Sequence, residues 1–308
     1  TWRRAHDQTF LTLPEWTVVY SADETGPFLA DHRPSAFPWF AAIGQFWTNY
    51  RAVWAVVRDR YDFNSQYHVM IGVVGASYTA EYAAKGLYEN TVGRVFEAFG
   101  ERVVEEDHYA RVTTDYGGFI HHTPWYRYPF AERRAELSGL EGGGGATLRR
   151  WERWFAESVE LTLKSWWSGV ITWGVGAYDP QATTIEAWVR PHAADVEAVE
   201  GVTILEELGQ GDVLVQIPRY EPFTNTMIDF AAAGIEVVEV AGNDTIVVQL
   251  QVPTGTDLSE YGGTLVRWNV LTDPTRDRVA LEVPMIDLVH TLPDLKSAGH
   301  TVEHVYDF

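Results

Sequence analysis

Charged side chains recur at intervals of one helical turn within the segment 64–99. Glu81, Lys85 and Glu89 are four residues apart, so in a helix they form one row. In an apolar setting such carboxylates act as acid and base or bind a cation. On a solvated helix face the same row is a ladder of intrahelical ion pairs. The pattern leaves both interpretations open, and a buried row would need a further cation to balance its net negative charge.

Two adjacent histidines form a second candidate site. His121 and His122 precede a Thr-Pro turn, where an imidazole can serve as a general base or bind a metal. Successive residues of a helix point about 100° apart, so at most one of the two faces a given site. His68 with Glu81 or Glu89 would complete a His/carboxylate set of the kind that binds zinc or non-haem iron. His68, His121 and His122 are therefore the candidate metal ligands, and the alternative is that the pair stabilises a helix C-terminus.

Aromatic residues crowd the part of the chain before residue 190. Of 13 tryptophans, all but Trp268 lie there. Such density lines a cavity for an apolar or ring-shaped ligand, fills a core, or faces lipid. The candidate ligand-binding residues lie near the charged row and the histidine pair: Tyr78, Tyr82, Tyr88, Arg94, Trp125 and Tyr126. No cofactor is assigned from these residues.

The charge balance and the absence of cysteine exclude several classes of protein. The chain has 43 Asp and Glu against 23 Lys and Arg, a net charge of −20. That balance disfavours nucleic acids and anionic membranes as partners. Without cysteine the chain has no disulfides, thiol nucleophiles or thiolate-bound metals. No uncharged apolar run reaches the roughly 18 residues of a membrane-spanning helix, and no P-loop or GxSxG motif occurs.

Helical periodicity dominates the first part of the chain. Residues 1–30 are expected to be irregular, with a strand at 15–20. Helices are expected at these ranges: 37–60, 64–99, 105–121, 129–140 and 147–174. The helix 64–99 is apolar on most sides, so we expect it to be the long central helix of an aromatic-rich helical domain. Its lane of small residues offers a groove for the aromatic stripe of helix 37–60.

The helix 147–174 has a continuous apolar stripe. The residues of this stripe recur every three or four positions and are expected to face the core: Leu148, Trp151, Phe155, Val159, Leu163 and Trp166. The helix follows Gly142–Gly145, a flexible loop that is either native or engineered.

After residue 190 strands alternate with short helices, and the pattern repeats. In each copy a strand ends in proline, a helix ends at glycine, and the second strand is expected to lie parallel to the first. The copies span about 203–252 and 264–308. We therefore predict an α+β fold in two parts: a helical domain at 1–190 and a ferredoxin-like α+β domain at 191–308 with two βαβ-type repeats.

These features favour a binding function for the helical domain. Its partner would be an apolar small molecule or a protein, and an oligomer is compatible with the sequence. One alternative is an enzyme, metal-dependent or acid–base, that uses Glu81, Glu89 and His121 or His122. Another is a structural component of a cell-envelope complex. The chain starts at Thr1 without methionine, which fits an envelope protein whose signal or anchor was removed, or a cytoplasmic protein.

Overall fold

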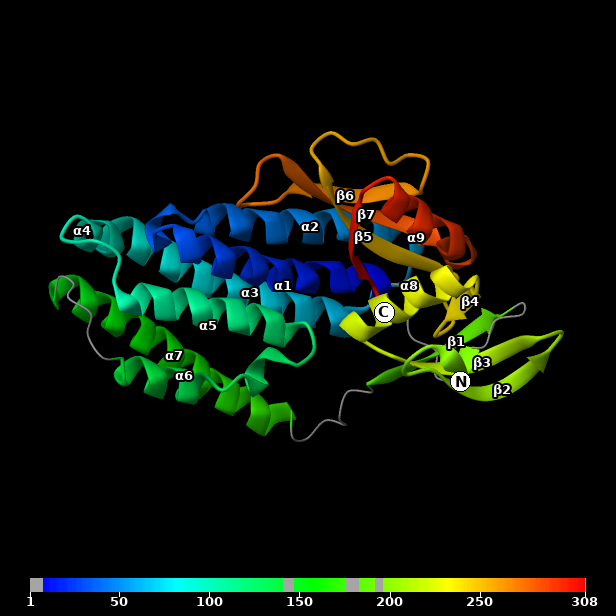
Figure 1. The fold of residues 1–308 in the computed structure, drawn as a ribbon, viewed down its shortest axis with the longest axis horizontal. Coiled ribbons are helices and arrows are strands. Elements are labelled where there is room, and N and C mark those ends of the chain that lie inside the picture. Colours follow the sequence, from blue (N-terminus) through cyan, green and yellow to red (C-terminus); the bar gives the residue numbers. More distant parts are fainter. Residues whose placement is uncertain (1–7, 141–146, 176–182, 192–195, 308) are drawn as a thin grey trace. The chain divides into compact units, whose positions relative to one another are not determined.

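The chain folds into two compact units (Figure 1). The computed structural model describes residues 8–140, 147–175, 183–191 and 196–307. The sheet unit comprises Thr1–Trp16, Trp47–Val73 and Gln181–Phe308. The helical unit comprises Thr17–Phe46 and Val74–Pro180. An α+β fold in two parts is therefore present, but each unit is assembled from separate segments, and the first strand begins at Thr184, before the predicted boundary at 190.

The first segment is a helix, and the predicted irregular stretch with a strand at 15–20 is wrong. Helix α1 runs over Gln8–Asp31 without interruption at Pro14. The Thr-Val-Val run favoured a strand locally, yet α1 is buried on most sides, so tertiary packing decides its conformation. Gly26 makes that burial possible, because a Cβ there would lie 2.7 Å from the backbone of Thr114. Helix α1, rather than the predicted 64–99, is the most buried helix.

The expected helix pair 37–60 and 64–99 is present. Helix α2 covers Trp39–Arg60, and helix α3 covers Ser65–Tyr88 and continues through a π-helical turn, Glu89–Gly93, into α4, Arg94–Glu97. Asn64 begins α3 as predicted, since its Oδ1 accepts a bond of 3.2 Å from the amide of Tyr67. Small residues of α3 do receive aromatic residues of α2: a Cβ at Gly86 would lie 3.0 Å from the ring of Phe40.

The remaining helices follow the predicted ranges closely. Helix α5 spans Val104–Ile120, α6 spans Phe130–Ser138 and α7 spans Thr147–Val175. The predicted loop Gly142–Gly145 lies outside the described residues.

The polarity of α7 is the reverse of the prediction. Leu161 is buried, but nine large apolar side chains of this helix, including all six of the predicted stripe, are solvent-exposed: Leu148, Trp151, Trp154, Phe155, Val159, Leu163, Trp166, Trp167 and Val170. Its buried side includes Arg149, Glu152, Arg153 and Glu157. The spacing of the apolar stripe is therefore as predicted, but the stripe faces outward. The charged side chains face inward because their ion-pair partners lie on α3 and α5.

In the sheet unit, two four-stranded antiparallel sheets have the same topology. The first contains β1 (Thr184–Arg190), β2 (Thr203–Gly209), β3 (Asp212–Pro218) and β4 (Glu236–Val240). The second contains β5 (Thr245–Pro253), β6 (Gly263–Asn269), β7 (Arg276–Pro284) and β8 (Thr301–Val305). The strand orders are β2-β3-β1-β4 and β6-β7-β5-β8. Helix α8 (Glu221–Ala233) follows β3, helix α9 (Leu288–Ser297) follows β7, and both sheets and helices share one apolar core.

The repeating unit is therefore three strands, a helix and a fourth strand. Strands β3 and β4 do run parallel to each other, but β1 lies between them and pairs antiparallel with both. Each repeat begins one strand earlier than predicted, at β1 and at β5. A ferredoxin-like fold would place a second helix between the first two strands, and the described part of each repeat has at most a short 3₁₀ turn, Val196–Ala198, at that position.

Candidate functional site

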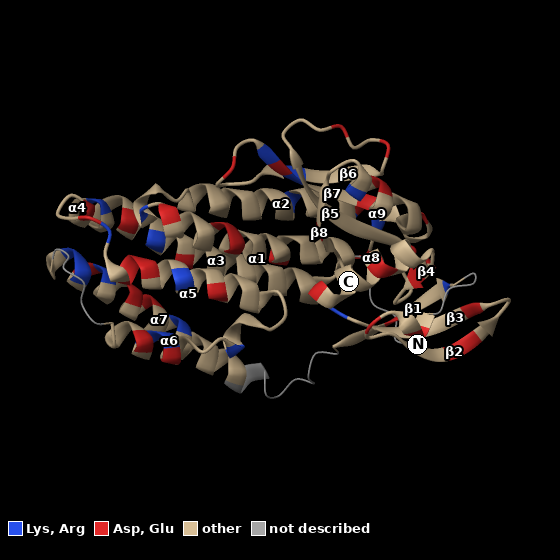
Figure 2. Ribbon diagram, viewed as in Figure 1, with Lys and Arg blue, Asp and Glu red and all other residues tan. Residues whose placement is uncertain are grey.

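A layer of charged side chains lies between α3, α5 and α7 of the helical unit. Figure 2 shows acidic and basic residues along these helices. One end of the layer is a closed tetrad. Lys85 Nζ lies 2.8 Å from an oxygen of Glu81 and 2.8 Å from an oxygen of Glu160. Lys164 Nζ lies 2.9 Å from Glu81 and 3.3 Å from Glu160. The row Glu81–Lys85 is thus balanced by two residues of α7, and the four side chains are half-buried.

The tetrad holds its four groups in their charged forms. Burial opposes ionisation of Glu81, but Lys164 and Lys85 outweigh it, so the pKa of Glu81 lies well below its usual value. Burial likewise opposes the charge of Lys85, and Glu160 with Glu81 raises its pKa well above the usual range. The ring of Tyr109 lies 5.8 Å from Lys85 and that of Tyr116 lies 4.8 Å from Lys164. Aromatic rings therefore lie next to both ammonium groups, in addition to the carboxylates that pair with them.

Glu89 belongs to a second cluster, centred on α7. Its Oε1 accepts a bond of 2.9 Å from Arg153, which also pairs with Glu152. Glu152 in turn accepts bonds from Arg149, at 2.8 Å, and from the hydroxyl of Tyr88, at 2.6 Å. Arg149 is fully buried and binds Glu106 of α5 at 2.8 Å. The predicted catalytic row is therefore divided between two clusters of one layer.

Four carboxyl groups of this layer have an oxygen without a hydrogen-bond partner among the described residues: Glu89, Glu97, Glu105 and Glu157. The pKa values of Glu89 and Glu157 are also raised. Oε2 of Glu89 is buried at the π-helical turn, where Gly93 leaves room for it: a Cβ at Gly93 would clash with that oxygen. Oε2 of Glu157 is similarly buried, while its Oε1 lies 2.5 Å from Nδ1 of His108. Burial raises the pKa of both carboxyls above the usual value, although Arg153 and His108 oppose the shift. These are the groups of the layer most suited to holding a proton.

The predicted metal ligands are placed in two different units. His68, in the sheet unit, is enclosed by aromatic rings: Phe63 stacks on it at 4.8 Å, Trp54 meets it edge-on at 4.6 Å, and Tyr50 bonds its Nδ1 at 3.0 Å. His121, in the helical unit, lies 2.7 Å from Asp23. His122, the next residue, is exposed. Within the described ranges no group of three or more His, Asp or Glu side chains is arranged to hold a metal ion, and the three ligands remain a prediction.

The predicted ligand-binding residues lie on different elements of the helical unit. Tyr78 and Tyr82 are buried with ring centroids 4.1 Å apart, and the hydroxyl of Tyr78 donates to Ser21 at 2.7 Å. Tyr88 bonds Glu152, as described above, and Arg94 is exposed on α4. Trp125 and Tyr126 are half-buried in the turn that precedes α6.

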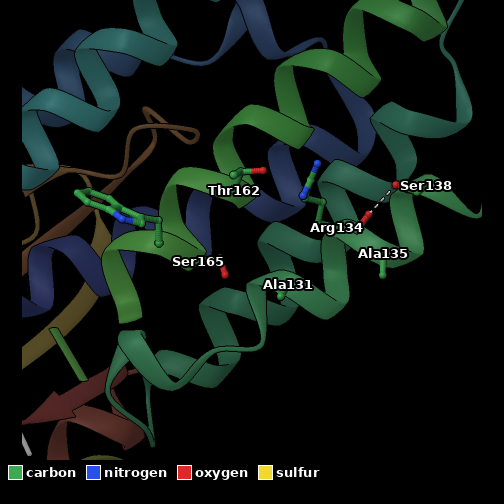
Figure 3. A pocket seen from close by; sticks show the side chains of 7 residues that line it. Ala131, Arg134, Ala135, Ser138, Thr162 and Ser165 are labelled. Atoms are coloured by element: carbon green, nitrogen blue, oxygen red, sulfur yellow. Dashed lines mark hydrogen bonds between the residues drawn. The ribbon is translucent and has the colours of Figure 1, made fainter. Parts of the chain in front are cut away.

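A pocket of about 440 Å³ lies between α6 and α7 (Figure 3). Its lining is small and polar apart from one tryptophan: Ala131, Arg134, Ala135, Ser138, Thr162, Ser165 and Trp166. Ser138 donates to the carbonyl of Arg134 at 3.2 Å, so that hydroxyl is engaged within α6. None of the predicted catalytic, ligand-binding or metal-ligating residues lines this pocket, although Trp166 of the predicted apolar stripe does.

Comparison with models of known protein families, with curated proteins and with solved structures finds no match. Function must therefore be argued from the site alone. The residues of α7 that complete the charged layer were missed by the sequence analysis. A signal for them exists: Arg149, Arg153, Glu157, Glu160 and Lys164 recur every three or four residues, opposite the apolar stripe. In addition, no described helix has both the length and the apolar character needed to cross a membrane.

Proposed function

We propose that this chain is a binding protein that attaches to an apolar partner surface through the outer face of α7. The observation that carries the proposal is the reversed polarity of this helix. Over 147–172 every charged residue of α7 is buried or half-buried, and its exposed large side chains are all apolar. A helix of a free monomer has the opposite arrangement.

The size of this surface supports a partner. Nine large apolar side chains of α7 are each between 37% and 66% exposed. Together they present on the order of 900 Å² of apolar area, well above the few hundred Å² of ordinary exposed patches. Tryptophan, four times present here, is also the residue type most enriched at binding hot spots. The buried charged layer then has a structural role, because it fixes α7 with this face outward.

Titration with an apolar fluorescent dye such as ANS tests the proposal. Dilute folded protein should enhance the dye emission, and the double variant Leu163→Glu, Trp166→Glu should lose most of that enhancement. Leu205→Glu is the matched control, because Leu205 is a similarly exposed leucine in β2 of the sheet unit. Equal dye binding by the double variant and the native chain would contradict the proposal.

A second candidate function is acid–base catalysis within the charged layer. The specific observation in its favour is the unpartnered buried oxygen of Glu89 at a π-helical turn, a feature frequent at functional sites. Metal analysis and native mass spectrometry of the purified protein test it. A stoichiometric bound metal or organic molecule that is lost in Glu89→Gln would favour the enzyme, and a mass equal to the bare chain would count against it.

A further inference from the structure

We propose that the partner covering α7 is a second copy of this chain, with α7 of each copy packed on α3 of the other. This inference rests on the proposed function, because it names the partner of the same face. It adds α3 to the interface and specifies the symmetry.

Helices α3 and α7 are linked by ion pairs within the helical unit. They are antiparallel neighbours, since Glu81 pairs with Lys164, Lys85 with Glu160 and Glu89 with Arg153. On the outward side α7 has its ridge of large apolar residues. The outward side of α3 has a lane of small exposed residues, which ends at the exposed Leu87: Ala76, Ser77, Ala80 and Ala84. The residues that flank the seam between the helices are therefore large on one helix and small on the other.

This surface is complementary to itself. A two-fold axis near the seam places the ridge of each copy over the lane of the other, which gives an isologous interface. Small residues let helices approach closely, and large apolar residues fill the space above them. The α7 side chains alone offer on the order of 900 Å² per copy, against roughly 800 Å² per partner in a standard stable interface. The area therefore suffices for a stable dimer.

Charge does not oppose the docking of a second copy at this surface. Two molecules of net charge −20 repel one another, so they can associate only through a surface without charge. The outer faces of α7 over 147–172 and of α3 over 74–88 have no exposed charged residue. Most surface of the molecule would bring carboxylates together, and this surface does not.

A lipid surface fits less well. Helices that lie on membranes carry Lys and Arg along their polar side, where these residues meet anionic headgroups. Here the basic residues of α3 and α7 are paired with carboxylates of the charged layer: Lys85, Arg149, Arg150, Arg153 and Lys164. The acidic chain would also be repelled by anionic lipid.

Sedimentation equilibrium of the full chain, from about 0.1 to about 50 µM, tests the inference. We expect the native chain to reach twice its monomer mass across this range. Leu163→Glu, Trp166→Glu should remain monomeric with an unchanged circular dichroism spectrum, because both side chains are exposed. Leu205→Glu should dimerise like the native chain. A native chain that stays monomeric at about 50 µM, or a charged variant that still dimerises, would overturn the inference.

Cross-linking tests the predicted pairing of helices. The chain has no cysteine, so single cysteines report without background. Mixing Leu163→Cys with Ala80→Cys and oxidising the mixture should give a disulfide-linked pair between the two variants. The matched mixture of Leu205→Cys with Ala80→Cys should give none. A linked control pair, or no link between the first two variants in a confirmed dimer, would overturn the α7-on-α3 arrangement.

The two proposals fail in different ways. A monomeric native chain that still binds ANS through Leu163 and Trp166 overturns the dimer and leaves the binding function standing. If that monomer also floats with neutral phosphatidylcholine vesicles and the charged variant does not, lipid is the partner instead. If the charged variant matches the native chain in mass, dye binding and flotation, both proposals are wrong.

Discussion

Glu15 is a carboxyl group that the fold holds near its point of protonation. It lies on α1 in the sheet unit, where its Oε2 accepts a bond of 3.5 Å from the hydroxyl of Tyr67. Burial raises its pKa to about 7; Tyr67 opposes the shift, Asp307 adds to it and Arg219 reduces it. In the unfolded chain the same group titrates near 4.5. The folded state therefore binds one more proton than the unfolded state between these two pH values.

We expect the free energy of unfolding to fall as the pH rises from 4.5 to 7 on account of Glu15. The contribution is fully present below the unfolded pKa and is lost once the pH exceeds the folded one. It amounts to about 1–3 kcal/mol, the lower figure allowing for the partial exposure of the side chain. Urea unfolding at constant ionic strength measures it. Glu15→Gln should flatten this part of the pH profile, and an unchanged slope would show that Glu15 does not titrate in this window.

Two isosteric substitutions separate the two clusters of the charged layer. Glu81→Gln removes a charge that two lysines share, so we expect a loss of about 1–3 kcal/mol in the free energy of unfolding. Glu89→Gln replaces a carboxyl with a raised pKa by a neutral group of the same shape. Its loss should be below about 1 kcal/mol at mildly acidic pH. The comparison is made by chemical denaturation, and a loss of only a few tenths for Glu81→Gln would favour the interpretation as a solvated ladder.

At the residue scale the sequence predicts the ion pair within one helix but not the partners that come from other helices. The spacing of Glu81 and Lys85 indicates their contact, which is present at 2.8 Å. Their partners on α7 are about 75 residues away, and nothing local indicates which of its two faces would meet α3. Tertiary partners of buried charges depend on helix packing, which spacing alone does not determine.

At the scale of the element, Gly26 sets the distance between α1 and α5. The site has no room for a methyl group, because the backbone of Thr114 would lie 2.7 Å from it. We expect Gly26→Ala to lower the free energy of unfolding by about 2 kcal/mol or more through overpacking. Thermal or urea unfolding measures the change.

Gly44→Ala on α2 is the matched control. No atom lies within 4 Å of a Cβ built at Gly44, so alanine only improves helix propensity there. It should stabilise the fold by about 0.5–1 kcal/mol. A destabilising effect of similar size in both variants would show that the contact with Thr114 is not the cause.

Elements with a clear period are predicted better than elements buried all round. The strands β3, β5 and β7 alternate or run apolar between turn residues, and their positions follow from that pattern. Helix α1 has no dominant polar face, so its β-branched residues suggest a strand that packing overrules. In α7 the period is clear, but periodicity shows only which residues share a face of the helix. It does not show which face is buried.

At the scale of the whole molecule, the net charge makes stability depend on salt. A chain of net charge −20 repels itself, and the buried ion pairs are screened far less than exposed charges. We therefore expect the unfolding temperature to rise as salt increases from about 10 mM to about 1 M. Calorimetry at fixed protein concentration measures it, and a fall with salt would mean that exposed ion pairs outweigh the repulsion.

The reversed polarity of α7 also bears on how the chain reaches its fold. If the helix were rotated about its own axis so that its opposite face pointed inward, its tryptophans would face the interior. Most amphipathic helices bury their apolar face in this way. Burial of the exposed apolar side chains favours that wrong orientation, and the salt links to α3 and α5 together with the burial of Leu161 favour the right one. We therefore expect a rotated α7 to be the main kinetic trap in refolding. Early pairing of Arg149 and Arg153 with their glutamates would be the step that avoids it.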